Sequence, residues 1–324
     1  MSDSADLLIV GAGPSGLSCA IEAQRAGLSA IVLEKGSVVD YIRRFPLNLV
    51  WFSTPELLEI GDVPFVISTV RPTRIDTLNY YHKVVEHYRL DIRPFDAVEK
   101  VQRNARDFVV RTVSGKTYSG KNVVVATGYF DHPNRLGIAG EDLPHVMHYY
   151  DEPFKYFGSN VAVVGGRNSA VEAALDLYRH GARVTLIHRG SSLSDGVKYW
   201  ILPDIENRIK SGQIAAVFSS VVEEIRTGEI TIRSVSGTTT LTSEFVFVLI
   251  GFRPDTTLFE KFGVEIDRET LAPCSGEHFE TNVPGLFVAG SVVAGRFNNK
   301  IFVENGRLHG RQIIRAIVGQ SPKS

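Results

Sequence analysis

Apolar and polar positions along the first part of the chain predict a unit of strand, turn, helix and strand. An apolar run over 7–10 leads into a glycine-rich turn, and a helix-length stretch follows it. A second apolar run over 30–33 ends in Glu34. Short apolar runs separated by a helical stretch are typical of a parallel α/β sheet. The rest of the chain is interpreted from this unit.

Three glycines in the turn have separate physical roles. Gly11 permits the tight turn, Gly13 leaves bare backbone for a pyrophosphate, and Gly16 lets the helix lie close to the sheet. Phosphates would lie at the helix N-terminus, where unpaired N–H groups favour negative charge. Glu34 is placed to accept hydrogen bonds from ribose hydroxyls. The pattern predicts dinucleotide binding, and the alternative is a structural glycine turn in a domain without a nucleotide.

The same pattern occurs a second time in the chain. An apolar run over 160–164, a glycine turn and a helix-length stretch lead to a strand over 183–187. Gly165 precedes His188 by 23 residues, which is the separation of the corresponding residues in the first unit. Equal spacing indicates that one supersecondary unit is used twice.

The second turn differs from the first at one position. Arg167 stands where the first turn has its middle glycine, although Gly165 and Gly166 still leave bare backbone. The guanidinium of Arg167 could itself reach a phosphate. Asn168 and Ser169 either contact the phosphate or cap the following helix.

The residues after the second strand of each unit distinguish the two ligands. Glu34 suits a free 2′-hydroxyl, whereas His188 and Arg189 offer cationic donors that suit a 2′-phosphate. The sequence therefore predicts FAD at the first site and NADPH at the second. The alternative for the basic pair is a solvated pair at a strand end.

Periodicity predicts further elements around these units. A helix is expected to begin at a cap on Asp76 or Thr77, and 301–318 has helical character. The segment 37–74 shows no clear periodicity of apolar residues. A loop of that length usually covers a functional surface, which here is either a substrate pocket or a partner surface. Short strands are expected over 97–101, 108–113, 116–119, 123–126, 220–226, 229–234 and 244–250.

Composition narrows the function classes. The chain has 324 residues, enough for two domains, and its net charge of −1 gives no pull toward nucleic acid or an anionic membrane. No apolar run is long enough to span a bilayer, and no secretory signal is expected, so we expect a cytoplasmic protein. The two cysteines, Cys19 and Cys274, form no CxxC, and no metal site and no catalytic side-chain pair are predicted.

Five motifs in this order resemble a known superfamily. They read GAGPSG, ATG, GGRNSA, GFRP and TNVPGLFVAGS, and they resemble the flavoprotein disulfide reductases of low-molecular-weight thioredoxin reductase type. Three longer stretches resemble the bacillithiol disulfide reductase family in particular. These are FSTPELLEIGDVPF from 52, YWILPDI from 199 and IFVENGRLHG from 301.

The resemblance implies an α/β fold of two Rossmann-like, three-layer ββα domains. An NADPH domain over 131–251 would be inserted into an FAD domain over 1–130 and 252–324, in a homo-oligomer that reduces a small-molecule acceptor. The implied FAD residues are Gly11, Gly13, Gly16, Glu34, Lys35, Thr127, Gly128, Gly290 and Ser291. We also predict that Ser15 in the glycine turn and Lys300 and Ile301 at the entrance of the last helix contact FAD. The implied NADPH residues are Gly165, Gly166, Arg167, Asn168, Ser169, His188 and Arg189.

The chain also departs from these families. No CxxC is present, which excludes dithiol exchange of the thioredoxin reductase kind. The closer family carries a cysteine where this chain has Ser15, whose hydroxyl forms no mixed disulfide. Cys19, on the same helix face, is either a displaced thiol or a small core residue. Ser291 stands where the superfamily has an aspartate and keeps a hydrogen-bonding group.

The predicted reaction is hydride transfer from NADPH to FAD, followed by reduction of an acceptor. The helix beginning near Ile301, with Asn299 and Lys300 beside it, is expected to stabilise negative charge on the reduced flavin. The alternative is an ordinary polar helix entrance. Three acceptor hypotheses stay open: bacillithiol disulfide, a non-disulfide acceptor such as a quinone, a ferredoxin or oxygen, and no acceptor at all in a flavin sensor.

Overall fold

The chain divides into two compact units in the computed structural model, which describes residues 3–105, 107–297 and 300–320. The chain passes between the units four times, because the short segment Phe45–Asn48 groups with unit 2. Unit 1 consists of Met1–Arg44, Leu49–His132 and Phe252–Ser324, and unit 2 consists of Phe45–Asn48 and Pro133–Gly251.

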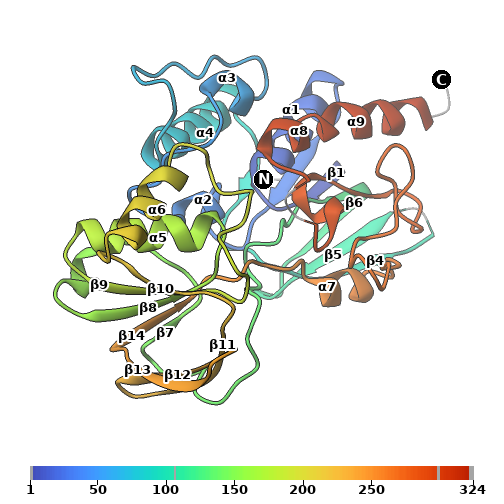
Figure 1. Ribbon diagram of the computed structural model, residues 1–324. Coiled ribbons are helices and arrows are strands. Elements are labelled where there is room, and N and C mark those ends of the chain that lie inside the picture. The colour runs from blue at the N-terminus through green and yellow to red at the C-terminus, as the bar shows by residue number, and fades with distance from the viewer. Residues whose placement is uncertain (1–2, 106, 298–299, 321–324) are drawn as a thin grey trace. The chain divides into compact units, whose positions relative to one another are not determined.

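Unit 1 is built on a seven-stranded sheet (Figure 1). The strand order is β3-β2-β1-β6-β5-β4, and β15 also pairs with β6. The strands β1, β2, β3, β6 and β15 run parallel, whereas β4 and β5 are antiparallel. Their bounds are β1 Ser4–Val10, β2 Ala30–Leu33, β3 Ile92–Arg93, β4 Val98–Arg103, β5 Phe108–Thr112, β6 Thr117–Val125 and β15 Leu286–Val288.

Strand β6 pairs with two different strands along one of its edges. Its first half pairs with β5, since Arg111 lies opposite Thr117, and its second half pairs with β15, since Leu286 lies opposite Val123. The separate strands predicted over 116–119 and 123–126 are therefore wrong. Strand β1 runs beside both halves and holds them in one ladder, although the polar residues between them break the apolar pattern.

Helices cover one face of this sheet, where α1 and α9 pack on each other (Figure 1). A Cβ on Gly310 of α9 would lie 2.8 Å from the Cys19 backbone nitrogen of α1, so the two helices approach closely. The helices of unit 1 are α1 Pro14–Arg25, α2 Asp40–Arg43, α3 Pro55–Leu58, α4 Arg74–Tyr88, α7 Thr256–Lys261, η2 Gly290–Ala294, α8 Val303–Gly306 and α9 His309–Gln320.

The single helix predicted over 301–318 is wrong, because the chain forms α8 and α9 with a break at Arg307 and Leu308. The Arg307 carbonyl accepts a hydrogen bond from the Ser18 hydroxyl (2.6 Å). The Arg307 guanidinium donates to the carbonyls of Glu56 and Glu59. These contacts outside the helix fix the break.

The segment 37–74 contains the two short helices α2 and α3 and an antiparallel bridge between Val50 and Thr73. Thr73 is the N-cap of α4, and its hydroxyl and the Asp76 carboxylate form a reciprocal capping box. The predicted cap at Asp76 or Thr77 is wrong by about one turn. Asp76 does take part in the cap, but as its third helical residue.

A buried carboxylate braces the end of strand β2. The Asp96 side chain accepts hydrogen bonds from Tyr118 and Ser114, each at 2.7 Å. Its backbone N–H donates to the Glu34 carbonyl (2.8 Å). Burial acts to raise the pKa of Asp96, but hydrogen bonds from Tyr118 and Ser114 outweigh it and lower the pKa to about 2. The loop before β4 is thereby tied to the residue that follows β2.

Unit 2 has a parallel five-stranded sheet of order β10-β9-β8-β14-β7. Its sheet strands are β7 Val146–Met147, β8 Asn160–Val164, β9 Arg183–Ile187, β10 Ala215–Val217 and β14 Phe245–Val248. Its helices are η1 Phe154–Tyr156, α5 Asn168–Arg179 and α6 Leu202–Lys210, and its antiparallel meander is β11 Val221–Arg226, β12 Glu229–Ser234 and β13 Gly237–Thr242.

Alternating residues of β8 fill the two cores of unit 2. Val161 and Val163 pack with the helices, and Ala162 and Val164 pack with the meander. The two meander strands predicted over 220–226 and 229–234 are confirmed. Strand β13 was not predicted, because its threonine-rich run is almost entirely exposed and shows no alternation.

Unit 1 has a mixed sheet with parallel central strands, and unit 2 has a parallel sheet with a separate antiparallel meander. Helices pack on both sheets, so the predicted α/β fold of two Rossmann-like domains is confirmed. No helix in the described ranges is long and apolar enough to cross a membrane.

We expect Asp96→Asn to lower the free energy of unfolding by about 2 kcal/mol at pH 7, since the native pKa lies well below that of an unfolded aspartate. The contribution of a carboxyl with a lowered pKa is present above about pH 4 and is lost as the pH falls through about 2. Urea unfolding at several pH values checks this. The variant should therefore lose less stability than the wild type between pH 4 and 2.

The matched control is Asp142→Asn, whose side chain is 88% exposed. It should change stability by less than about 0.5 kcal/mol. Equal stability losses for the two variants at pH 7 would contradict the role given to Asp96.

Candidate functional site

The two predicted units are both present in the structure. Strand β1, helix α1 and strand β2 form the first, and β8, α5 and β9 form the second. In each, the two strands are adjacent and parallel. Glu34 follows β2 in unit 1 and His188 follows β9 in unit 2, so the candidate sites lie at the carboxyl ends of parallel strands.

The glycines of the first turn fall into two kinds. Gly11 has φ +109°, and a Cβ there would lie 2.6 Å from the Ala126 carbonyl oxygen. A Cβ on Gly16 would overlap the Gly11 carbonyl oxygen. At Gly13, by contrast, the nearest atom to an added Cβ would belong to the Tyr41 ring at 3.6 Å. The chain's own packing therefore requires Gly11 and Gly16, whereas at Gly13 a Cβ would make only an ordinary van der Waals contact with Tyr41.

Glu34 is buried and holds the turn in place. Its carboxylate accepts hydrogen bonds from the backbone N–H groups of Ala12 (2.7 Å) and Gly36 (2.8 Å). Burial raises the pKa of Glu34 and outweighs the lowering effect of these two bonds. One N–H donor occupies each oxygen, and a carboxylate oxygen can accept a second. Glu34 can therefore order the turn and still accept from a ribose hydroxyl.

Lys35, the next predicted ligand, already has a partner in unit 1. Its Nζ lies 2.5 Å from the Asp131 carboxylate, which also pairs with Arg44. Burial acts to raise the pKa of Asp131, and hydrogen bonds from Lys35 and Arg44 with their charges outweigh it and lower the pKa. A cofactor that used Lys35 would compete with this ion pair.

Two loops from other strands meet the first turn. Thr127 and Gly128 follow β6, and Gly290 and Ser291 follow β15. A Cβ on Gly128 would lie 3.6 Å from Ser291 Oγ. A Cβ on Gly290 would lie 2.6 Å from Ser15 Oγ. The structure thus brings together the predicted residues from three segments that are far apart in the sequence.

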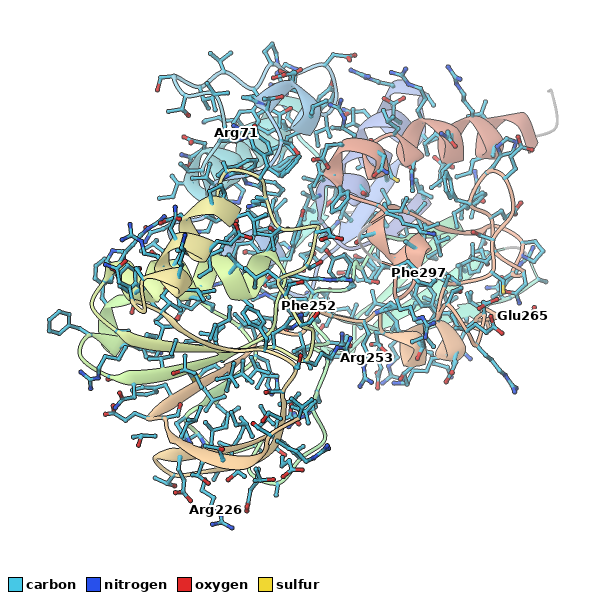
Figure 2. All side chains as sticks on the ribbon, viewed as in Figure 1. Arg71, Arg226, Phe252, Arg253, Glu265 and Phe297 are labelled. Atoms are coloured by element: carbon cyan, nitrogen blue, oxygen red, sulfur yellow. The ribbon has the colours of Figure 1, made fainter. Side chains whose placement is uncertain are left out.

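The structure describes only two of the three residues predicted at the entrance of the last helix of unit 1. Asn299 lies outside the described residues. Lys300 is exposed and its Nζ lies 4.9 Å from the ring centroid of Phe297, which Figure 2 labels. Ile301 packs near Gly306, within 3.4 Å of a Cβ placed there. Because α8 has only four residues, its dipole is smaller than that of the long helix predicted from 301.

His188 lies over the second glycine turn. A Cβ on Gly166 would lie 2.5 Å from the His188 ring, and one on Gly190 would lie 2.7 Å from its Nε2. A Cβ on Gly165 would lie 2.5 Å from the Leu249 carbonyl oxygen. The ring in this position therefore requires that Gly166 and Gly190 lack side chains, while Gly165 is required by the Leu249 backbone.

Positive charge gathers at this turn. Burial lowers the pKa of His188, and the charges of Arg189 and Arg167 lower it further. Among the described residues, no carboxylate forms an ion pair with Arg167 or Arg189, and both side chains are exposed. Unpaired cations around exposed backbone suit a phosphate group.

Asn168 has a role that was not predicted. Its side-chain amide donates to the Gly196 carbonyl (3.0 Å) and accepts from the Lys198 N–H (2.8 Å). The Ser194 N–H donates to the Gly166 carbonyl (3.0 Å). These bonds pin the loop 194–198 beside the glycine turn. The sequence held one signal for this loop, the glycine- and serine-rich run that follows the basic pair.

The predicted capping role of Asn168 and Ser169 is wrong. The N-cap of α5 is Arg167, which makes no side-chain cap hydrogen bond, and Ser169 is exposed in the first turn of the helix. Asn168 begins the helix and uses its amide on the loop instead.

Neither cysteine forms part of a reactive pair. Cys19 is fully buried, and burial raises its pKa to about 12. It packs where α9 crosses α1, so the displaced-thiol alternative is wrong and Cys19 is a small core residue. Cys274 is exposed and free.

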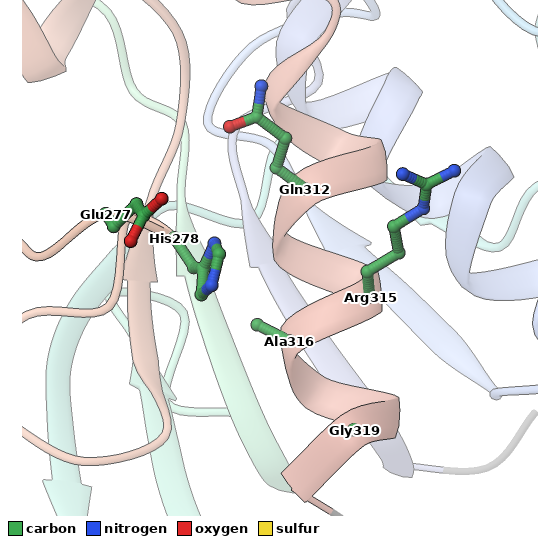
Figure 3. A pocket seen from close by; sticks show the side chains of 6 residues that line it. All are labelled: Glu277, His278, Gln312, Arg315, Ala316 and Gly319. Carbon is green, nitrogen blue, oxygen red and sulfur yellow. The ribbon is translucent and has the colours of Figure 1, made fainter.

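One cavity of about 490 Å³ opens in unit 1 between α9 and the loop before β15 (Figure 3). None of the predicted site residues lines it. Its lining consists of Glu277, His278, Gln312, Arg315, Ala316 and Gly319.

Comparison with known proteins gave consistent results. The sequence profile of the family described as "Pyridine nucleotide-disulphide oxidoreductase" matches residues 8–290. "Bacilliredoxin reductase Bdr" from Bacillus subtilis (strain 168) is 44% identical over 312 residues, which cover 96% of each chain.

Two solved structures agree closely with this one. "Bacillithiol Disulfide Reductase Bdr (YpdA)" from Bacillus cereus has a TM-score of 0.96 and 40% identity, covering 98% of this chain and 100% of that one. The protein of the same title from Staphylococcus aureus has a TM-score of 0.95 and 35% identity, covering 98% and 99%.

The contrast between the glycines of the first turn is testable by alanine substitution. Gly16→Ala should lower the free energy of unfolding by several kcal/mol, on the order of an overpacked core, because its Cβ meets a carbonyl oxygen. Gly13→Ala has an ordinary φ of −74° and its Cβ would make only an ordinary van der Waals contact, so it should change stability by less than about 0.5 kcal/mol.

Denaturant unfolding of both variants without added nucleotide gives the comparison. A large loss for Gly13→Ala would show that this glycine, too, serves the packing of the chain itself.

Proposed function

This chain belongs to the pyridine nucleotide-disulphide oxidoreductase family, and from that premise we propose that it uses NADPH and FAD to reduce a low-molecular-weight disulfide such as bacillithiol disulfide. The predicted resemblance to the bacillithiol disulfide reductase family is confirmed, and so is the prediction of an oxidoreductase. The observation that carries the choice of substrate is the match to such reductases over nearly the whole of both chains.

We assign FAD to unit 1 and NADPH to unit 2. The open backbone at Gly13 and the buried carboxylate of Glu34 fit the adenosine half of FAD, which has a free 2′-hydroxyl. The guanidinium groups of Arg167 and Arg189 fit the 2′-phosphate of NADPH, and His188, whose lowered pKa keeps its ring neutral at pH 7, can add an N–H donor. When bound, NADPH supplies a hydride and FAD accepts it.

The other predicted residues of unit 1 have supporting positions in this assignment. Gly11 and Gly16 shape the turn that would receive the pyrophosphate, and the loops at 127–128 and 290–291 would border the same ligand. The assignment of FAD depends less on three other predicted residues, Lys35, Lys300 and Ile301. Lys35 is paired with Asp131, and Lys300 is exposed.

The predicted residues of unit 2 also include both direct ligands of the nucleotide and a residue that acts indirectly. Gly165 and Gly166 would offer backbone to the pyrophosphate, and Ser169 is exposed at the start of α5, where N–H groups are unpaired. Asn168 acts through the loop that it pins rather than as a direct ligand.

The chain itself supplies no thiol pair for disulfide exchange. Ser15 stands where the closer family has a cysteine, and Cys19 is buried with a raised pKa. The contribution of the protein is therefore to bind and orient the two cofactors and the acceptor. Ser15 also favours the second candidate function, in which the acceptor is a quinone, a ferredoxin or oxygen.

We further propose a homo-oligomer that acts in the cytoplasm. Two unpaired cysteines, one of them exposed, suit a reducing compartment. A monomeric mass in light scattering would contradict the oligomer.

The acceptor can be identified with anaerobic assays on the yellow protein. We expect NADPH oxidation that depends on bacillithiol disulfide and releases two thiols for each NADPH. Ser15→Ala should keep the rate within about threefold, because a hydroxyl takes no part in thiol exchange. Turnover with a quinone, ferredoxin or oxygen but not with the disulfide would support the second candidate, and an unreduced flavin would support a sensor.

Coenzyme preference tests the assignment of unit 2. Arg189→Ala should raise the Kd of NADPH by about tenfold and leave that of NADH within about twofold, because only NADPH carries the 2′-phosphate that the guanidinium would bind. Titration by calorimetry measures both constants.

Arg183→Ala is a matched control, since Arg183 is an exposed arginine at the opposite end of β9. It should leave both dissociation constants unchanged. A parallel loss of NADPH and NADH binding in Arg189→Ala would contradict recognition of the 2′-phosphate by this residue.

A further inference from the structure

A buried histidine holds the turn that follows strand β15. The Gly290 N–H donates a hydrogen bond to His309 Nδ1 (3.1 Å), and the pair is buried. His309 is the first residue of α9, 19 positions along the chain from Gly290. Gly290 has φ +77°, so the turn has a backbone conformation that needs support from its surroundings.

The setting of His309 fixes the role of its ring. Its side chain is buried and stacks on Phe279, with ring centroids 4.1 Å apart and planes inclined by 16°. Burial lowers the pKa of His309 to about 4, so the imidazole is neutral at pH 7. Because Nδ1 accepts the Gly290 N–H, Nε2 carries the ring proton in this assignment.

Phe279 connects this ring back to the strand. The Phe279 carbonyl accepts the Val288 N–H (2.9 Å), and the next residue, Glu280, bridges to Phe287. Val288 ends β15, two residues before Gly290. Val288 is hydrogen-bonded to Phe279, Phe279 stacks on His309, and His309 is hydrogen-bonded to Gly290. These three contacts hold both ends of the segment 288–290.

The cavity in Figure 3 separates the loop before β15 from helix α9, so the two have few other contacts near His309. Glu277 and His278 line it from the loop, and Gln312, one helical turn beyond His309, lines it from α9. Both sides are exposed there, so loop and helix separate beyond the stacked pair. The stacked pair joins the two walls, since Phe279 follows His278 in the loop and His309 precedes Gln312 in α9.

The opposite side of the turn faces the first glycine motif. A Cβ on Gly290 would lie 2.6 Å from Ser15 Oγ, and a Cβ on Gly306 would lie 3.0 Å from the same atom. Gly290 is therefore held through its N–H on one side and lies against Ser15 on the other. A rotation of its peptide plane would break the hydrogen bond and change what the turn presents beside Ser15.

We propose that His309 is a positioning residue for FAD: its Nδ1 holds the Gly290 N–H and so fixes the 290–291 turn in the orientation that receives the cofactor. This inference rests on the proposed binding of FAD in unit 1. His309 itself need not touch the cofactor, since it acts through the backbone of the turn.

Two amides of different reach test the proposal. His309→Asn places an acceptor near the position of Nδ1, whereas His309→Gln places it near that of Nε2. We expect the Asn variant to bind FAD within about threefold of the wild type and the Gln variant about tenfold more weakly, because only Gln leaves the buried Gly290 N–H unpaired. Quenching of FAD fluorescence by deflavinated protein measures the Kd.

His309→Phe completes the series, since it keeps an aromatic ring for Phe279 and has no acceptor. Its FAD affinity should fall at least as far as that of the Gln variant. Thermal unfolding of the three apoproteins controls for stability. If FAD affinity follows apoprotein stability and the Asn and Gln variants bind equally, the positioning role is overturned. If the Phe variant does not fold, the Asn and Gln pair still decides.

The outcome is distinguishable from failure of the proposed function. A wild-type protein that binds no FAD would refute FAD binding in unit 1 and leave the series without a reference. A wild-type protein that binds FAD, with equal affinity in all variants, would refute only the role of His309.

Discussion

The structure depends on how a residue at the end of a strand braces the adjacent glycine turn. In unit 1 the Glu34 carboxylate accepts the Ala12 N–H at 2.7 Å, at a buried position where the charge would be costly without donors. Gly16 can approach Gly11, and Gly11 can approach Ala126 after strand β6, only without side chains. The turn is therefore shaped before any nucleotide is present, and the open backbone at Gly13 is a consequence of that shape.

Unit 2 achieves the same bracing with different chemistry. The His188 ring takes the place of the carboxylate and packs over Gly166 and Gly190. A ring that braces by packing makes no hydrogen bond to the turn, so charge around it can be positive, as Arg167 and Arg189 make it. In unit 1 the same residue, Glu34, supports the turn and is the one that we propose to contact the ribose. In unit 2 the two tasks fall to neighbours, since His188 supports the turn and we propose that Arg167 and Arg189 contact the 2′-phosphate.

Local patterns in the sequence predicted the two units well, because each is set by contacts within about 30 residues. The two-strand interpretation of β6 was wrong, since β1, which is distant along the chain, pairs with both of its halves. The single helix from 301 was wrong for a similar reason, as Ser18 binds the Arg307 carbonyl at the break. The sites followed the same rule: the glycines and Glu34 were visible in the sequence, whereas the loop held by Asn168 and the histidine behind Gly290 are tertiary contacts with no local signal.

Helix α1 has a serine at position 15, beside the 290–291 turn, and its one cysteine at position 19. They lie one turn apart on the same helix, yet Ser15 is half-buried with its Oγ beside Gly290 and Gly306, while Cys19 is fully buried and its backbone nitrogen lies beside Gly310. Only position 15 adjoins the turn to which we assign FAD. The sulfur at position 19 has a pKa raised to about 12, so it forms almost no thiolate at neutral pH. Cys19 therefore supplies no reactive thiol beside the 290–291 turn, and what the chain contributes there is the rigidity of the turn itself.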